Sequence, residues 1–197
     1  MKEYFTDINN LEASLLKRCI SIILVFITLL CSCSSYSIVG QGKNYIITQS
    51  NKSHQYHYKI LDNNGKTIEE EDISTYPKIQ AVSDSIIEVQ TGSGNVVYRR
   101  YFNINDRKKS ELFQNPIIMD YGKIVYASIK EGNIILVVQD LFDSAYFYKE
   151  FELNFSPVAI PEDAIINAQF IENGKKLRLK YLSGDDYVEK TEDLNLD

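Results

Sequence analysis

Residues 56–65 read Tyr-His-Tyr-Lys-Ile-Leu-Asp-Asn-Asn-Gly, and this stretch decides the fold class. Tyr56, Tyr58 and Ile60 alternate with His57 and Lys59, which is the period of two that a β-strand uses and a helix cannot. The Asp-Asn-Asn-Gly that follows is typical of a tight hairpin, because Asn and Asp tolerate positive φ and Gly adopts it freely. The stretch therefore predicts a strand that ends in a hairpin turn.

The same pattern continues along the chain from Tyr45. Short runs rich in Ile, Val, Tyr and Phe alternate with sequences that favour turns. These turns are predicted at residues 62–65, 83–85, 92–95, 105–106, 131–133, 172–174 and 183–186. A candidate first strand occupies residues 36–39, and the best candidate for one helical turn lies at residues 140–146. The sequence therefore predicts an all-β fold built as an antiparallel meander.

A weak internal repeat of four units runs through this meander. Apolar strands end at Gln49, Gln90, Gln139 and Tyr181, which are 41, 49 and 42 residues apart, and a strand that carries Tyr follows each one. Propeller blades have roughly 40–50 residues, so four units predict a small propeller or an open, propeller-like meander. Residues 187–194 could then pair back with residues 36–39. A plain antiparallel β-sandwich or barrel is the alternative.

Composition and charge limit the function. The chain has 197 residues, of which 44% are hydrophobic, which suits one globular domain or two very small ones. The formal net charge of -6 argues against general nucleic-acid binding, which needs a basic surface. Because Cys19, Cys31 and Cys33 are the only cysteines, the chain beyond Cys33 has no thiol for a disulfide, a metal site or catalysis.

The N-terminal segment has the organisation of a secretory signal. Lys17 and Arg18 precede an apolar run at residues 20–30, and Cys-Ser-Cys-Ser-Ser follows at residues 31–35. The run is about half of the ~20 apolar residues that a helix needs to span a bilayer. We expect an N-terminal signal helix here, with an uncleaved single-span anchor and a buried core helix as the alternatives.

Leu30-Cys31-Ser32-Cys33 resembles the lipobox of bacterial membrane lipoproteins. The resemblance implies cleavage between Ser32 and Cys33, a diacylglycerol thioether on Cys33 and, in many bacteria, acylation of the new amino group with a chain such as palmitate. It further implies an extracytoplasmic protein, lipid-anchored to the cell membrane or the outer membrane. The implied organisation is a signal peptide at 1–32, the lipidated Cys and a short tether at 33–44, and a single all-β domain at 45–197.

The sequence supplies no catalytic, cofactor-binding or metal-ligating residues. His54 and His57, with Asp62 nearby, invite a metal site, but residues three apart on a strand point to opposite faces. The Gly-Ser-Gly within residues 91–95 lacks the spacing of a nucleophile elbow. Residues 62–65 lack the spacing of a calcium loop. We therefore predict ordinary hairpins at both places and no cofactor.

Charged and aromatic residues suggest surfaces rather than reactions. The acidic groups at 69–72 and 185–186 are expected to be solvated edges, and the basic groups at 99–100 and 107–109 would suit lipid headgroups or an acidic partner. The 14 tyrosines would suit peptide or sugar binding if several shared one concave face. The sequence favours an exported, lipid-anchored binding protein with an unidentified protein, peptide or glycan ligand. A lipid-anchored hydrolase with a loop-built site and a structural accessory of an envelope complex are the alternatives.

Overall fold

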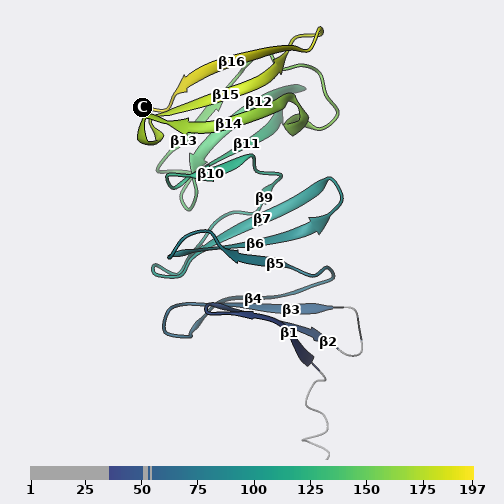
Figure 1. The fold of residues 1–197 in the computed structure, drawn as a ribbon, viewed down its shortest axis with the longest axis vertical. Coiled ribbons are helices and arrows are strands. Elements are labelled where there is room, and N and C mark those ends of the chain that lie inside the picture. The colour runs from purple at the N-terminus through teal and green to yellow at the C-terminus, as the bar shows by residue number, and fades with distance from the viewer. Residues whose placement is uncertain (1–35, 51–52, 54) are drawn as a thin grey trace, which may run out of the picture.

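Four antiparallel β-sheets follow one another along the chain in the computed structural model, which describes residues 36–50, 53 and 55–197 (Figure 1). The predicted all-β meander is confirmed, because strands that are consecutive in sequence are hydrogen-bonded neighbours within each sheet, except that β9 pairs with β7. The candidate first strand at residues 36–39 is present as the start of the first sheet. The expected signal helix at residues 1–32 lies outside the described residues.

The strands divide among the sheets in chain order. Sheet 1 contains β1 (Tyr36–Gly42), β2 (Tyr45–Ser50), β3 (Tyr56–Leu61) and β4 (Thr67–Ile73). Sheet 2 contains β5 (Lys78–Ala81), β6 (Ile86–Ser93), β7 (Val96–Asn103), β8 (Lys108–Lys109) and β9 (Phe113–Gln114), and both β8 and β9 pair with β7. Sheet 3 contains β10 (Ile118–Asp120), β11 (Lys123–Lys130), β12 (Asn133–Asp140) and β13 (Tyr148–Phe151). Sheet 4 contains β14 (Ile165–Ile171), β15 (Lys176–Ser183) and β16 (Val188–Asn195), with short 3-10 turns at Pro161–Ala164 and Glu172–Gly174.

The sheets are stacked in a row, from sheet 1 at the bottom of Figure 1 to sheet 4 at the top. A separate apolar cluster fills each layer between neighbouring sheets. The layer between sheets 1 and 2 contains Ile47, Tyr58, Ile60, Ile79, Ile87, Val89, Phe102 and Ile104. The next layer contains Tyr101, Phe113, Ile124 and Leu141, and the last contains Val125, Leu136, Val138, Phe170, Leu177, Leu179, Tyr181, Leu194 and Leu196.

The middle sheets are buried on both faces, and their strands show this in their sequences. In β12, the four consecutive residues from Ile135 to Val138 are all buried. Successive side chains on a strand point to opposite faces, so a continuous apolar run supplies both neighbouring layers at once. Sheet 1 lies at one end of the stack, and so only one of its faces is covered by another sheet. This explains why apolar and polar residues alternate so clearly along β3.

The stack is open, and the pairing expected to close it is not formed. β16 pairs with β15, and β1 pairs with β2, at opposite ends of the row (Figure 1). The prediction that residues 187–194 return to residues 36–39 is therefore wrong. The physical reason lies on the outer face of sheet 4, where Arg178 pairs with Asp193 and Lys180 pairs with Glu189. A face occupied by ion pairs offers no apolar surface to bury against sheet 1.

The seven predicted turns all join consecutive strands. The predicted four-unit repeat corresponds to the four sheets, with one difference in phase. The apolar strands that end at Gln49, Gln90 and Tyr181 are each the second strand of their sheet. The apolar strand that ends at Gln139 is the third strand of sheet 3. This difference lengthens the step from Gln90 to Gln139 to 49 residues, and the long connection between β13 and β14 keeps the next step at 42 residues.

Residues 140–146 do not form the expected helical turn. The Asp140 carboxylate accepts hydrogen bonds from the backbone N–H groups of Phe142 and Asp143, both at 2.9 Å. The Asp140 N–H donates to the Phe147 carbonyl oxygen at 2.9 Å, which continues the β12–β13 ladder, and the Tyr146 N–H donates to the Asp143 carbonyl oxygen at 3.0 Å, which forms a single tight turn. The segment therefore connects β12 to β13 as an irregular loop.

Candidate functional site

The residues implied by the lipobox, Ser32 and Cys33, lie outside the described residues, as does His54. The first described residue after them is Tyr36, which begins β1 in the end sheet of the stack. The nearest part of the fold to Cys33 along the chain is therefore sheet 1.

The outer face of sheet 1 has no other sheet packed on it (Figure 1). Its central row contains Ile38, Thr48, His57 and Asp72, which are register partners across β1 to β4. Register partners share a face, and so their side chains lie side by side across the sheet. The row changes from apolar at the β1 edge to charged at the β4 edge.

A shallow hollow of about 550 Å³ lies on this face. Its lining consists of Tyr36, Ile46, Thr48, His57, Lys59 and Asp72. The Tyr36 and His57 rings are tilted against each other, with their centroids 6.5 Å apart. Tyr36 is 46% exposed and Ile38 is 63% exposed, so the apolar part of the face is open to contact.

The charges on this face are already paired with one another. Lys59 Nζ lies 2.8 Å from Glu70 Oε2, and the ammonium group lowers the pKa of the Glu70 carboxyl below its ordinary value. His57 Nδ1 lies 2.9 Å from Asp72 Oδ1. The face therefore combines exposed apolar side chains with charges that have local partners, which describes a contact surface better than a catalytic one. We refer to this surface, defined by Tyr36, Ile38 and the lining of the hollow, as the end face.

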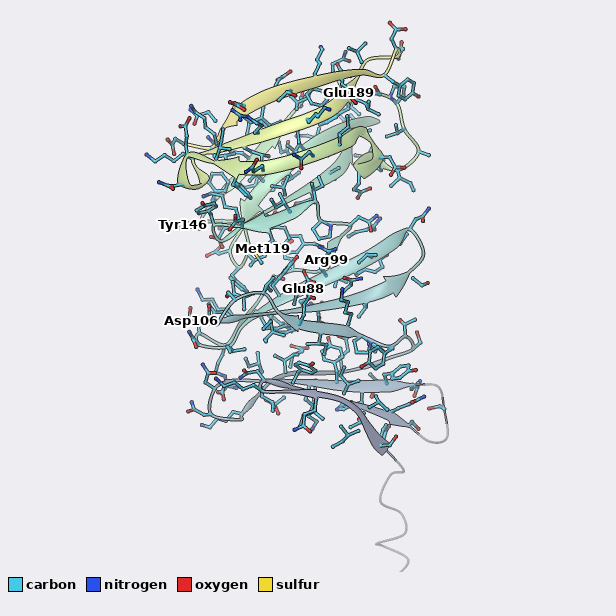
Figure 2. All side chains as sticks on the ribbon, viewed as in Figure 1. Glu88, Arg99, Asp106, Met119, Tyr146 and Glu189 are labelled. Carbon is cyan, nitrogen blue, oxygen red and sulfur yellow. The ribbon has the colours of Figure 1, made fainter. Side chains whose placement is uncertain are left out.

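The opposite end of the stack, the outer face of sheet 4, is covered by ion pairs. On the outer face of sheet 4, Arg178 makes two hydrogen bonds to the Asp193 carboxylate, at 2.8 and 2.9 Å. Lys180 Nζ lies 2.6 Å from Glu189 Oε2, and Figure 2 places Glu189 at the top of the stack. Stacked repeat proteins need end units with a polar outer face for solubility. Sheet 4 meets that need more fully than sheet 1, and the two ends are chemically unequal.

Arg99 and Arg100 face opposite layers, as predicted for neighbouring residues on a strand. Arg99 is directed toward Glu88 between sheets 2 and 3, with a separation of 3.9 Å, and Figure 2 shows both side chains. Arg100 lies 3.7 Å from Glu71 between sheets 1 and 2. The two arginines therefore serve two different layers.

Other basic residues of sheet 2 pair with carboxylates of sheet 1. Lys109 Nζ lies 2.8 Å from Glu69 Oε2, and an Arg107 nitrogen lies 3.2 Å from Asp62 Oδ2. The acidic and basic groups found in the sequence therefore meet each other and join two sheets. The expectation of solvated acidic edges holds for Glu70, which is exposed and pairs with Lys59 of the end face, but not for Glu69.

The remaining sequence candidates are structural. Residues 91–95 form part of the β6–β7 hairpin, as predicted. Asp62 Oδ1 accepts hydrogen bonds from the N–H groups of Asn64 and Lys66, at 2.9 and 2.8 Å, and so it organises its own turn. Within residues 36–50, 53 and 55–197, no group of three or more His, Cys, Asp and Glu side chains could hold a metal ion.

Exposed tyrosines do not gather on one concave face. They occur on sheet 1, in loops and turns, and on sheet 3, and Tyr146 projects from the side of the stack in Figure 2. Among the described residues, the exposed tyrosines are Tyr36, Tyr76, Tyr121, Tyr146, Tyr148 and Tyr187. Sequence reasoning did not single out the end face. Its only signal was the spacing of Tyr36 and Ile38, two residues apart in the candidate first strand.

Comparison with known protein families, curated proteins and solved structures finds no match to the chain. In the part of the chain that the structure describes, no helix has the length and apolar character needed to cross a bilayer.

Proposed function

We propose that the chain is an exported protein, anchored to the cell membrane or the outer membrane by lipid on Cys33, that presents a β-rich binding module at the extracytoplasmic surface. The lipobox at residues 30–33 supports the anchor. Its partners are the membrane, through the anchor, and a protein, peptide or glycan ligand in the envelope.

One structural observation carries this proposal: the stack begins at Tyr36, three residues after Cys33, and extends away from that end as a row of sheets (Figure 1). An anchor at Cys33 would fix sheet 1 at the membrane and project sheets 2 to 4 outward. Such an arrangement suits a surface-displayed interaction module, because most of the surface stays accessible to other molecules.

Lipid labelling tests the anchor. Three cell cultures express the full chain, the Cys33→Ala variant or the Cys31→Ala variant. Each culture is grown with labelled palmitate, and its lysate is separated into membrane and soluble fractions. We expect Cys33→Ala to lose both the label and the membrane association, and Cys31→Ala to keep both. Cys31 is the matched control because it lies two residues away in the same motif. A labelled, membrane-bound Cys33→Ala variant would overturn the proposal.

A further inference from the structure

We propose that the end face of sheet 1 rests on the headgroup layer of the bilayer to which the protein is anchored, so that the stack stands on its first sheet. This inference rests on the proposed anchor at Cys33. It goes further, because it names the surface that contacts the lipid and the orientation that results.

The length of chain before β1 provides the first argument. Cleavage before Cys33 leaves Cys33, Ser34 and Ser35 ahead of Tyr36. An extended chain spans at most about 3.6 Å per residue, so Tyr36 can lie only about 10 Å from the anchored residue. The headgroup regions add roughly 5–7 Å to each side of the hydrocarbon core. β1 is therefore held at the membrane surface by the tether alone.

The chemistry of the end face provides the second argument. Tyr36 and Ile38 are exposed and lie near the tether on the outer face, where Tyr36 lines the hollow and Ile38 is the register partner of Thr48. Tyr is enriched where hydrocarbon meets water because its ring has an apolar body and a polar tip. The charged residues of the face belong to local pairs, Lys59 with Glu70 and His57 with Asp72. Paired charges tolerate a headgroup environment.

The contrast between the two ends provides the third argument. The face of sheet 4, far from the tether, is covered by ion pairs such as Arg178 with Asp193. The face with exposed aromatic and aliphatic side chains is the one that the tether holds near lipid. Because the net charge is -6, the contact depends on apolar and interfacial side chains and not on attraction to anionic lipid.

Site-directed fluorescence tests this orientation. A cysteine is introduced in place of Ile38 on the end face, in place of Gln41, which is the register partner of Ile46 on the same side of sheet 1, or in place of Thr191 on the outer face of sheet 4. The chain beyond Cys33 has no other thiol, so each labelled, lipidated protein carries one environment-sensitive probe. Each is reconstituted into phosphatidylcholine vesicles that contain a nitroxide-labelled headgroup lipid.

We expect the probes at positions 38 and 41 to shift to shorter wavelength and to be quenched by the nitroxide, and the probe at position 191 to do neither. If the lipidated protein binds the vesicles and all three probes behave alike, the inference fails while the anchor stands. If the protein carries no lipid, the proposed function itself fails. Shielding of position 38 in detergent, together with a dimer in sedimentation, would assign the end face to a second copy and overturn the inference.

Discussion

Tyr58 and Glu71 are register partners on β3 and β4, and the Tyr58 hydroxyl donates a hydrogen bond of 2.7 Å to Glu71 Oε2. The Tyr58 ring is buried between sheets 1 and 2, while its hydroxyl reaches a carboxylate that Arg100 also approaches at 3.7 Å. A buried tyrosine needs such a partner, because burial otherwise leaves its hydroxyl unsatisfied.

The same device recurs in the other sheets. Tyr126 donates to Gln139 Oε1 at 3.0 Å, and Tyr181 donates to Glu192 Oε1 at 2.6 Å. In sheet 2, Tyr101 is the register partner of the buried Glu88. Of these four tyrosines, Tyr58 and Tyr101 lie on the Tyr-bearing strands that suggested a repeat, and the other two lie on different strands. The recurring role is therefore a ring packed into a layer, with a carboxylate or amide on the neighbouring strand as the partner of its hydroxyl.

Removing one of these hydroxyls tests that role. Tyr58→Phe is expected to lower the free energy of unfolding by about 1 kcal/mol, since it keeps the ring and removes the hydrogen bond. Tyr146→Phe is the control, because Tyr146 is 84% exposed, and it is expected to change the stability by less than about 0.5 kcal/mol. Urea unfolding followed by circular dichroism measures both. Equal effects in the two variants would contradict the assigned role.

Alkaline pH is expected to unfold the stack through the same tyrosines. Burial raises the pKa of Tyr126 and of Tyr181 to about 12, and burial and nearby carboxylates raise the pKa of Tyr58 and Tyr101 as well. The unfolded phenols have a pKa near 10, so the native state holds its protons longer as the pH rises. The contribution is fully present below about pH 10 and is lost as the pH rises through the native values.

The measurement is a parallel titration of tyrosinate absorbance and circular dichroism. We expect the buried phenols to ionise in a cooperative step that coincides with the loss of sheet signal. Gradual ionisation of all tyrosines near pH 10 with the sheet signal intact would show that these hydroxyls are free.

The lowered pKa of the Asp62 carboxyl predicts that acid destabilises the protein. Hydrogen bonds from the Lys66 and Asn64 N–H groups and the charge of Arg107 lower the pKa of its carboxyl. Asp62→Ala is expected to destabilise the protein more than Asp62→Asn, because Asn keeps an oxygen for the turn. The advantage of the wild type over Asp62→Asn is present above the ordinary aspartate pKa, near 4, and is lost as the pH falls through the lowered value. Thermal unfolding across this pH range checks the order, and an Asn variant as damaging as Ala would contradict it.

Two glycines in the β6–β7 hairpin provide a matched pair. Gly92 has φ +100°, and a Cβ there would lie 2.4 Å from the Val96 carbonyl oxygen. Gly94 has φ +65°, with no atom within 4 Å of such a Cβ. Gly94→Ala is expected to cost about 1 kcal/mol of stability, and Gly92→Ala more than about 2 kcal/mol, because backbone must move. Urea unfolding of both variants checks this, and a Gly92→Ala cost no larger than that of Gly94→Ala would refute the steric argument.

Local features of the fold could be predicted from the sequence, because they depend on neighbouring residues. The alternation of Tyr56 to Ile60 and the Asp-Asn-Asn-Gly turn after Leu61 each identify one element without reference to the rest of the chain. The four repeat units were also visible. Whether those units close into a ring depends on the outer faces of sheets 1 and 4. The composition of those faces is decided only when the strand register of each sheet is fixed.

The end face was beyond prediction for the same reason. Ile46 and Ile47 are adjacent and equally apolar, yet Ile47 is buried against sheet 2 and Ile46 lines the outer hollow. Likewise, Glu69 and Glu70 are adjacent carboxylates, yet Glu69 binds Lys109 of sheet 2 and Glu70 binds Lys59 on the outer face. The sequence shows both residues of each pair, and only the sheet order decides which one is available to a partner.

Intact mass spectrometry of the mature polypeptide, purified from membranes, tests the central claim most directly. The account predicts a chain that begins at Cys33 and carries the added mass of a diacylglyceryl group. A chain that keeps residues upstream of Cys33 and carries no acyl mass would contradict it.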